Sequence, residues 1–86
     1  MNIDEQDFIQ YLTIKKKLAP KTVKTYKIRF LVVKRWLIDN KLEINKYTFE
    51  KFLFQLKEKQ RGNAALNTYI QAIKHVEGFC KDRGLP

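Results

Sequence analysis

The sequence is poor in the residue types from which most catalytic sites are built. It contains no serine, one histidine, one cysteine and three glycines among 86 residues. The lack of serine excludes a Ser-His-Asp arrangement, and His75 has no second histidine or nearby cysteine with which to hold zinc. The three glycines do not form a phosphate-binding loop. We therefore expect no catalytic residue, no metal site and no cofactor in this chain, and a surface or partly packed histidine.

Cysteine pairs and long apolar runs are also missing. Cys80 has no partner for an internal disulfide, and its apolar helical surroundings predict a small buried residue. The longest strictly apolar run, Phe30–Val33, is too short to span a bilayer. The acidic start Met1–Glu5 is unlike a signal peptide. These features favour an intracellular protein that does not enter a membrane.

Acidic side chains are scarce relative to basic ones. Nine Asp and Glu stand against 18 Lys and Arg, which gives a net charge of +9. The positive electric field of such a charge favours anionic partners, with nucleic acid and anionic membrane as the main candidates. The alternative is a lysine-rich, solvated surface. With 44% apolar and 13% aromatic residues, the chain has enough material for one small domain, residues 1–86, with one modest core.

Apolar periodicity predicts four helices and no strand, hence an all-α, compact four-helix bundle. The expected helices cover about residues 4–16, 20–39, 48–60 and 63–83. In the longest one, Pro20 fits the first turn, where a missing N–H costs nothing. Apolar residues then recur at spacings of three and four, which places them on one inward face: Val23, Tyr26, Phe30, Val33 and Leu37.

The other helices show inward faces of the same kind. The first contributes Phe8, Tyr11 and Leu12; the third contributes Phe49, Phe52, Leu53 and Leu56; the fourth contributes Leu66, Tyr69, Ile70, Ile73, Val76 and Cys80. Gly78 is expected to face outward on the fourth helix.

Helix ends follow from capping residues. Ala19 is a poor N-cap for the second helix, whereas Thr48 and Asn63 are plausible N-caps for the third and fourth. Asn40 tolerates the left-handed conformation that closes many helices, and Gly84 is expected to close the last one.

The side of helix 20–39 opposite its apolar stripe combines cations, small polar groups and exposed apolar residues. Lys21 and Thr25 are neighbours there, one turn apart. A lysine can reach a phosphate, and a threonine can contact a base edge or a thymine methyl group. We interpret this face as a DNA contact; the alternative is a solvated lysine face. Its proposed contact residues are Lys21, Lys24, Thr25, Ile28 and Arg29.

The start of helix 63–83 is a second candidate. Small and amide side chains suit a close approach to a phosphate backbone, a helix N-terminus favours phosphate, and Asn or Gln can read adenine. The alternative is capping by Asn63 with an ordinary polar exterior. The proposed contact residues are Asn63, Ala64, Asn67, Gln71 and Lys74.

Four segments in this order resemble one known family. They are the Leu-Ala-Pro-Lys-Thr-Val-Lys-Thr-Tyr segment at 18–26, Thr48–Leu53, Leu66–Phe79 and the closing Gly84-Leu-Pro86. Together they resemble the N-terminal core-binding domain of tyrosine recombinases, the phage-integrase family with a SAM-like fold. The resemblance covers nearly the whole chain, and the first segment is its most specific part.

The resemblance implies a function. In that family the second and fourth long helices lie against the major groove of the recombination site, so the domain clamps one face of the duplex. By resemblance, Lys21, Thr25 and the segment Asn63–Asn67 face double-stranded DNA. A separate C-terminal catalytic domain, expected after residue 86, clamps the other face and holds the catalytic residues. This chain alone is thus not expected to be an enzyme.

The resemblance also implies what kind of parent protein the domain belongs to and where that protein acts. The parent is expected to be a DNA strand-exchange recombinase that assembles as a tetramer on DNA, whereas the isolated domain is expected to be a monomer. Its expected location is the cytoplasm of a bacterial, archaeal or phage-encoded system, associated with the nucleoid. The abrupt end at Pro86 favours a fragment excised from such a parent.

Other classes of function remain open from the residues alone. SAM-like bundles also bind proteins, and Ile14, Ile38 and Phe54 are spare apolar residues that suit a protein-interaction module without DNA binding. An anionic-membrane binder is a weaker alternative, because no helix shows a broad exposed apolar face.

Overall fold

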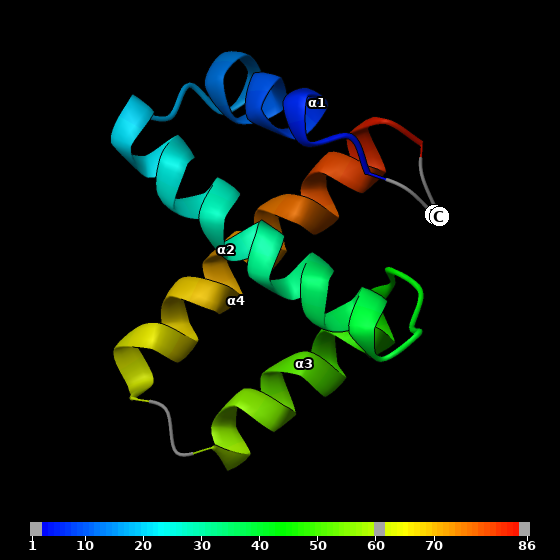
Figure 1. Ribbon diagram of the computed structural model, residues 1–86. Helices are drawn as coiled ribbons and strands as arrows, with labels where there is room; N and C mark the ends of the chain where they lie inside the picture. Colours follow the sequence, from blue (N-terminus) through cyan, green and yellow to red (C-terminus); the bar gives the residue numbers. More distant parts are fainter. Residues whose placement is uncertain (1–2, 60–61, 85–86) are drawn as a thin grey trace.

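Four α-helices joined by short turns make up most of the chain (Figure 1). The computed structural model describes residues 3–59 and 62–84, with the backbone alone at residue 63. The elements are α1 (Glu5–Gln10), a π-helical turn η1 (Tyr11–Lys15), α2 (Pro20–Asp39), α3 (Lys46–Glu58) and α4 (Asn63–Asp82). The described residues contain no strand, so the predicted all-α four-helix bundle is confirmed.

Helix α2 is the element that joins the others. It packs against α1, α3 and α4, and it crosses α4 in the middle of the molecule (Figure 1). Its length follows from the sequence, because its interior carries no Pro or Gly. Pro20 occupies the first turn, and Ala19 is an N-cap without a side-chain hydrogen bond, as predicted.

The first predicted helix changes its geometry along its length. Asp4 caps α1 by accepting a hydrogen bond from the Gln6 N–H at 2.8 Å. After Gln10 the helix widens into the π turn η1. The backbone N–H of Lys16 then donates to the carbonyl of Tyr11 at 3.1 Å. Lys17, with φ 53°, reverses the chain toward α2.

The end of α2 differs from the prediction. Asn40 has φ −97° and is not left-handed; Lys41, with φ 55°, takes that role. The N–H of Leu42 donates to the carbonyl of Leu37 at 2.9 Å, and the N–H of Lys41 donates to the carbonyl of Ile38 at 3.0 Å. This pair of bonds is the Schellman closure.

Helix α3 begins two residues earlier than predicted because another residue caps it. Asn45, not Thr48, is the N-cap, and its side chain accepts from the N–H of Thr48 at 3.0 Å. The Thr48 hydroxyl in turn accepts from the N–H of Asn45 at 3.0 Å. Both residues form a capping box, and Thr48 is its buried third position. The helix ends at Glu58, two residues before its predicted end, which lies outside the described residues.

Helix α4 begins at Asn63 because Gly62 occupies the N-cap position, so the prediction of Asn63 as the cap is wrong. The C-terminal end follows the prediction. Gly84 adopts φ 70°, the left-handed conformation in which glycine is favoured, directly after the cap residue Arg83.

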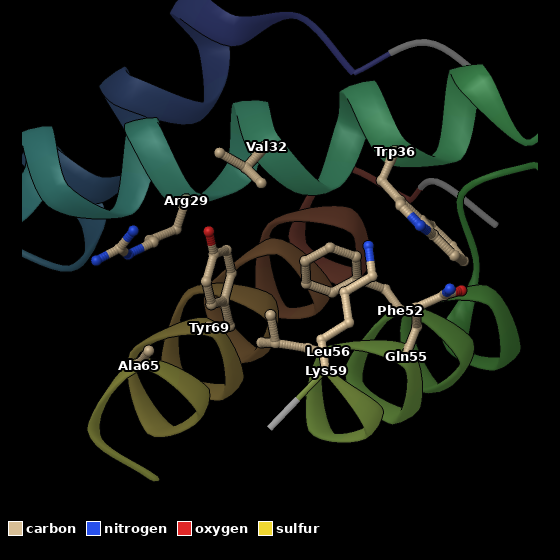
Figure 2. Close-up of a pocket in the computed structure, with 9 residues that line it drawn as sticks. All are labelled: Arg29, Val32, Trp36, Phe52, Gln55, Leu56, Lys59, Ala65 and Tyr69. Carbon is tan, nitrogen blue, oxygen red and sulfur yellow. The ribbon is translucent and has the colours of Figure 1, made fainter. Parts of the chain in front are cut away.

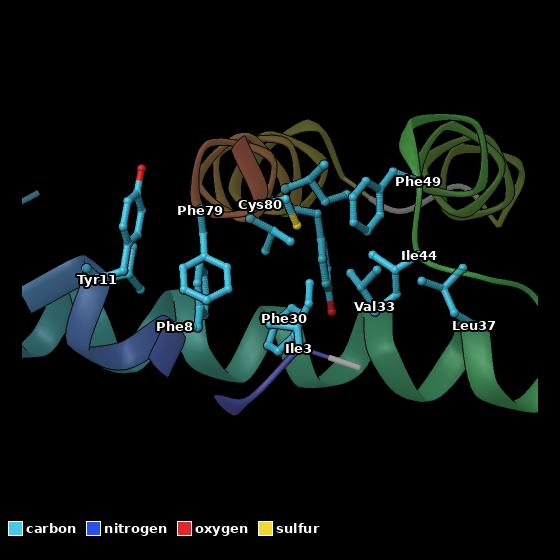
Figure 3. Close-up of a cluster of buried hydrophobic side chains, with 14 of the residues drawn as sticks. Ile3, Phe8, Tyr11, Phe30, Val33, Leu37, Ile44, Phe49, Phe79 and Cys80 are labelled. Carbon is cyan, nitrogen blue, oxygen red and sulfur yellow. The ribbon is translucent and has the colours of Figure 1, made fainter. Parts of the chain in front are cut away.

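The centre of the core is a cluster of aromatic rings from three helices (Figure 3). The Phe8 ring lies 5.0 Å from Phe30 and 5.6 Å from Phe79, centroid to centroid. Tyr11 meets Phe79 edge-on at 5.4 Å. Edge-to-face contacts of this kind add to the free energy gained by burying the rings. They hold α1 and α4 against the same side of α2.

Most of the predicted inward faces are confirmed. Among them, the residues that the structure buries are Phe8, Tyr11, Leu12, Val23, Phe30, Val33, Leu37, Phe49, Phe52, Tyr69, Ile73, Val76 and Cys80. Tyr26, Leu53, Leu56, Leu66 and Ile70 are only partly buried. The buried apolar residues Ile3, Ile44, Ala72 and Phe79 were not predicted.

Gly78 does not face outward, contrary to the prediction. A Cβ atom at this position would lie 2.9 Å from the Oη atom of Tyr11. That distance is shorter than a normal contact, so only glycine lets α4 approach the ring of Tyr11 this closely.

Truncating the central ring should destabilise the domain strongly. We expect Phe30→Ala to lower the free energy of unfolding by about 3–5 kcal/mol, because a fully buried ring is lost and a cavity remains. A small domain of this kind has roughly 5 kcal/mol in total, so much of the variant should be unfolded. Urea denaturation followed by circular dichroism measures the difference.

The matched control for this experiment is Phe54→Ala, since Phe54 is 67% exposed. The same substitution there should change the free energy of unfolding by no more than about 0.5 kcal/mol. Equal effects of the two substitutions would contradict the assignment of Phe30 to the core.

Candidate nucleic-acid interface

An open groove between α2 and α4 brings together one residue of the first predicted set and two of the second. Its volume is about 310 Å³. Thr25 lines it from α2, and Asn67 and Gln71 line it from α4. Thr22, Tyr26 and Thr68 complete the lining and were not predicted. Thr22 and Thr68 did leave a signal in the sequence, because Thr22 precedes Thr25 by about one turn and Thr68 follows Asn67.

Two of the threonine hydroxyls of this groove, those of Thr25 and Thr68, donate their protons within their own helices. The Thr25 hydroxyl donates to the carbonyl of Lys21 at 3.1 Å, and the Thr68 hydroxyl donates to the carbonyl of Ala64 at 2.9 Å. Bonds of this type fix the rotamer of the side chain. They leave the lone pairs of the oxygen and the methyl group available to a ligand. The threonines are therefore set to act as acceptors and apolar contacts.

A stacked pair of aromatic rings connects the two helices beside the groove. The Tyr26 ring stacks on His75 with centroids 4.7 Å apart and planes inclined by 29°. The Nδ1 atom of His75 lies 2.9 Å from the carbonyl oxygen of Gln71. His75 is half-buried, as the sequence predicts for a partly packed histidine. The pair ties the α4 turn that carries Gln71 to the wall provided by α2.

Lys21 and Lys74 lie one turn from Thr25 and Gln71 of the groove, whereas Lys24 lines a separate groove with Ile9 and Thr13. Lys21, Lys24 and Lys74 are exposed, and none takes part in the ion pairs found among the described residues. Residues 20–38 of α2 and residues 63–76 of α4 contain no Asp or Glu. Positive charge without neighbouring carboxylates produces a positive potential that attracts anions.

Comparison with known proteins agrees with this architecture. Residues 6–84 match the family described as the phage integrase N-terminal SAM-like domain. The chain belongs to this family. The resemblance expected from the sequence is thereby confirmed, and the domain is related to tyrosine recombinases. No match was found among curated proteins or among solved structures.

Arg29 lies apart from the other predicted contact residues of this SAM-like domain. Its guanidinium carbon is 4.9 Å from the centre of the Tyr69 ring. Its Nε atom is buried and has no hydrogen-bond partner among the residues that the structure describes. Arg29 and Val32 line a second groove, between α2, α3 and α4, and not the groove that contains Thr25.

The remaining predicted contact residues of the SAM-like domain lie at the surface. Ile28 is 45% exposed, on the side of α2 opposite the core, and Ala64 is exposed in the first turn of α4. The side chain of Asn63 lies outside the described part of the structure. Ile14, Ile38 and Phe54, the spare apolar residues, are also exposed.

Cys80 does not belong to this surface. It is buried, as predicted. Burial, and to a smaller degree the charge of Glu77, raise the pKa of its thiol. A thiol with a raised pKa stays protonated at neutral pH and is a poor nucleophile. Cys80 therefore acts as a small packing residue.

Among the residues that the structure describes, no helix has both the length and the apolar character needed to cross a bilayer.

Proposed function

We propose that this chain is the DNA-binding, core-binding domain of a site-specific tyrosine recombinase. The face formed by α2 and α4 lies against the major groove of the recombination site. The single observation that carries the proposal is the groove of Thr25, Asn67 and Gln71, with Lys21 and Lys74 one turn away and no Asp or Glu in residues 20–38 and 63–76. Membership of the phage integrase family supports the same conclusion.

The residues of this face divide into two roles. Lys21, Lys24 and Lys74 meet phosphates and supply affinity that does not depend on sequence. The first turn of α4 adds free backbone N–H groups that favour a phosphate, and exposed Ala64 allows a close approach.

The polar residues of the groove supply specificity. Asn67 and Gln71 have the amide groups that pair with adenine in the major groove, and the methyl groups of Thr25 and Ile28 fit thymine. Arg29 contributes less than a free arginine would, because its guanidinium lies over Tyr69.

The proposed partners follow from the family. A catalytic domain of the same parent chain closes on the opposite face of the duplex, and the parent acts in the cytoplasm as a tetramer on DNA. The isolated domain is a monomer and provides half of the clamp.

A second candidate function is a protein-interaction module. It is favoured by the exposure of Phe54 at 67% and of Ile14 at 66%, both outside the α2–α4 groove. Binding that survives high salt and requires Phe54 would support it, because apolar contacts are not screened by ions.

The primary test is a titration of the labelled domain with duplex DNA at two salt concentrations. We expect weak binding, because half of the clamp is missing. The dissociation constant for an arbitrary sequence at physiological salt should be roughly 10⁻⁴ to 10⁻⁶ M. A folded domain that fails to bind even at low salt would overturn the proposal.

Removing the charge of Lys21 should weaken binding to every sequence equally. We expect Lys21→Ala to lower the slope of log K against log salt by about one unit, because one phosphate contact is lost. The measurement is a salt series on two unrelated duplexes. Lys51→Ala is the control, since Lys51 is an exposed lysine on α3. If Lys51→Ala has the larger effect, the wrong face of the bundle has been placed on the DNA.

Thr25 should affect sequence preference and leave the salt slope unchanged. We expect Thr25→Ala to cost about 1 kcal/mol on the preferred duplex and nothing on a scrambled one. The preferred duplex is the one that the wild-type domain enriches from a random pool. Thr25→Val keeps the methyl group and Thr25→Ser keeps the hydroxyl, so the two variants identify the group that reads the base. Equal losses on both duplexes would contradict a role in base reading.

A further inference from the structure

A second groove lies between the C-terminal half of α2, the helix α3 and the start of α4 (Figure 2). Its volume is about 280 Å³. The side chains of Val32 and Trp36 point into it from α2 (Figure 2). Its apolar lining consists of Val32, Trp36, Phe52, Leu56, Ala65 and Tyr69. The ring of Trp36 meets Phe52 edge-on at 5.5 Å, and Phe52 meets Tyr69 at 5.3 Å.

The charges of this groove have one sign. Among the described residues that line it, Arg29 and Lys59 are the charged ones, and none is an acid. Val32 remains 42% exposed at its edge. The buried Nε of Arg29 has no acceptor among the described residues. A buried N–H without an acceptor is costly, and a carboxylate is the strongest partner for a guanidinium. The groove is therefore apolar and also suited to one or two anionic groups.

The size and lining of the groove restrict its occupant. Small-molecule sites usually have volumes of about 300–1,000 Å³, so a volume of about 280 Å³ suits one or two side chains. A DNA phosphate would satisfy Arg29 but would leave the aromatic lining without a partner. The Phe54 face of a second copy is a weaker match, because it carries both signs of charge: exposed Lys51 and Lys57, and also exposed Glu50 and Glu58, lie within one turn of Phe54.

We propose that this groove docks a short acidic and apolar segment of another protein. An aliphatic or aromatic side chain enters between Trp36 and Leu56, and a carboxylate accepts hydrogen bonds from Arg29. A second carboxylate lies near Lys59. An amphipathic helix with an apolar residue flanked by acids provides these groups. This docking site is additional to the proposed DNA contact and does not depend on it.

Trp36 makes the proposal directly testable, because it is the only tryptophan of the chain. The probe is an acetylated and amidated tetrapeptide, Glu-Leu-Phe-Glu, titrated into ¹⁵N-labelled domain. The signals to follow are the indole N–H of Trp36 and the Nε–H of Arg29. We expect both to shift and to saturate together. The peptides Lys-Leu-Phe-Lys and Glu-Ala-Ala-Glu should bind at least about tenfold more weakly. The first lacks the carboxylates, and the second lacks the large apolar side chains.

A pair of charge reversals provides the matched control. Lys59→Glu places a carboxylate in the groove and should weaken the acidic peptide at least about tenfold. Lys57→Glu makes the same change outside the groove and should leave peptide binding within about twofold of wild type, because Lys57 does not line the groove. Both lysines are exposed, so both variants should fold. Lys21→Ala should weaken duplex binding without affecting the peptide, which separates this proposal from the DNA contact.

Three results would overturn the docking proposal. The first is equal binding of all three peptides. The second is a Trp36 signal that shifts on dilution without peptide, which would assign the groove to a second copy of the chain. The third is a duplex that shifts the Arg29 signal and displaces the peptide, which would assign the groove to a DNA phosphate.

Discussion

The contacts of the Phe8 ring with Phe30 and Phe79 determine how α2 is turned, and the rest of the domain depends on that orientation. Phe30 faces inward, so the opposite side of the helix, with Lys21 and Ile28, must face solvent. Because α4 is packed against the same ring cluster through Phe79, its residues Asn67 and Gln71 are brought beside Thr25. The polar groove is thus a consequence of how three aromatic rings pack.

Charge is distributed unevenly over this scaffold. The acids lie in α1 and its cap, near the end of α2, in α3 and in the last turns of α4. Several of them pair with lysines and arginines there, as Asp82 does with Lys15 at 3.2 Å. The lysines beside the polar groove have no such pairs among the described residues. Their mutual repulsion is weak in salt water, and an anionic ligand would relieve it. The same positive field would also bring a negatively charged molecule toward the groove before any contact forms.

The sequence was sufficient for the elements but not for their ends or for the grooves. Periodicity predicted the inward stripe of Val23, Phe30 and Val33, because a helix with one buried face must repeat its apolar residues every three or four positions. The N-caps of α3 and α4 were misassigned, and with the first of them the start of α3, since two capping residues stand close together in each case and local propensity does not choose between them. Thr22 and Thr68 line the groove, and Arg29 packs against Tyr69, because of how one helix is rotated relative to another. The periodicity along a single helix carries no information about this rotation.

The close approach of Gly78 to Tyr11 links two positions that are 67 residues apart in the sequence. A methyl group at position 78 would lie 2.9 Å from the Tyr11 Oη atom, so an alanine there requires the Tyr11 side chain to shift or to lose its hydroxyl. Substitutions at these two positions should therefore be tolerated together more readily than singly. The spacing between η1 and α4 therefore depends on two residues together, because Gly78 has no side chain and the Tyr11 hydroxyl lies next to it.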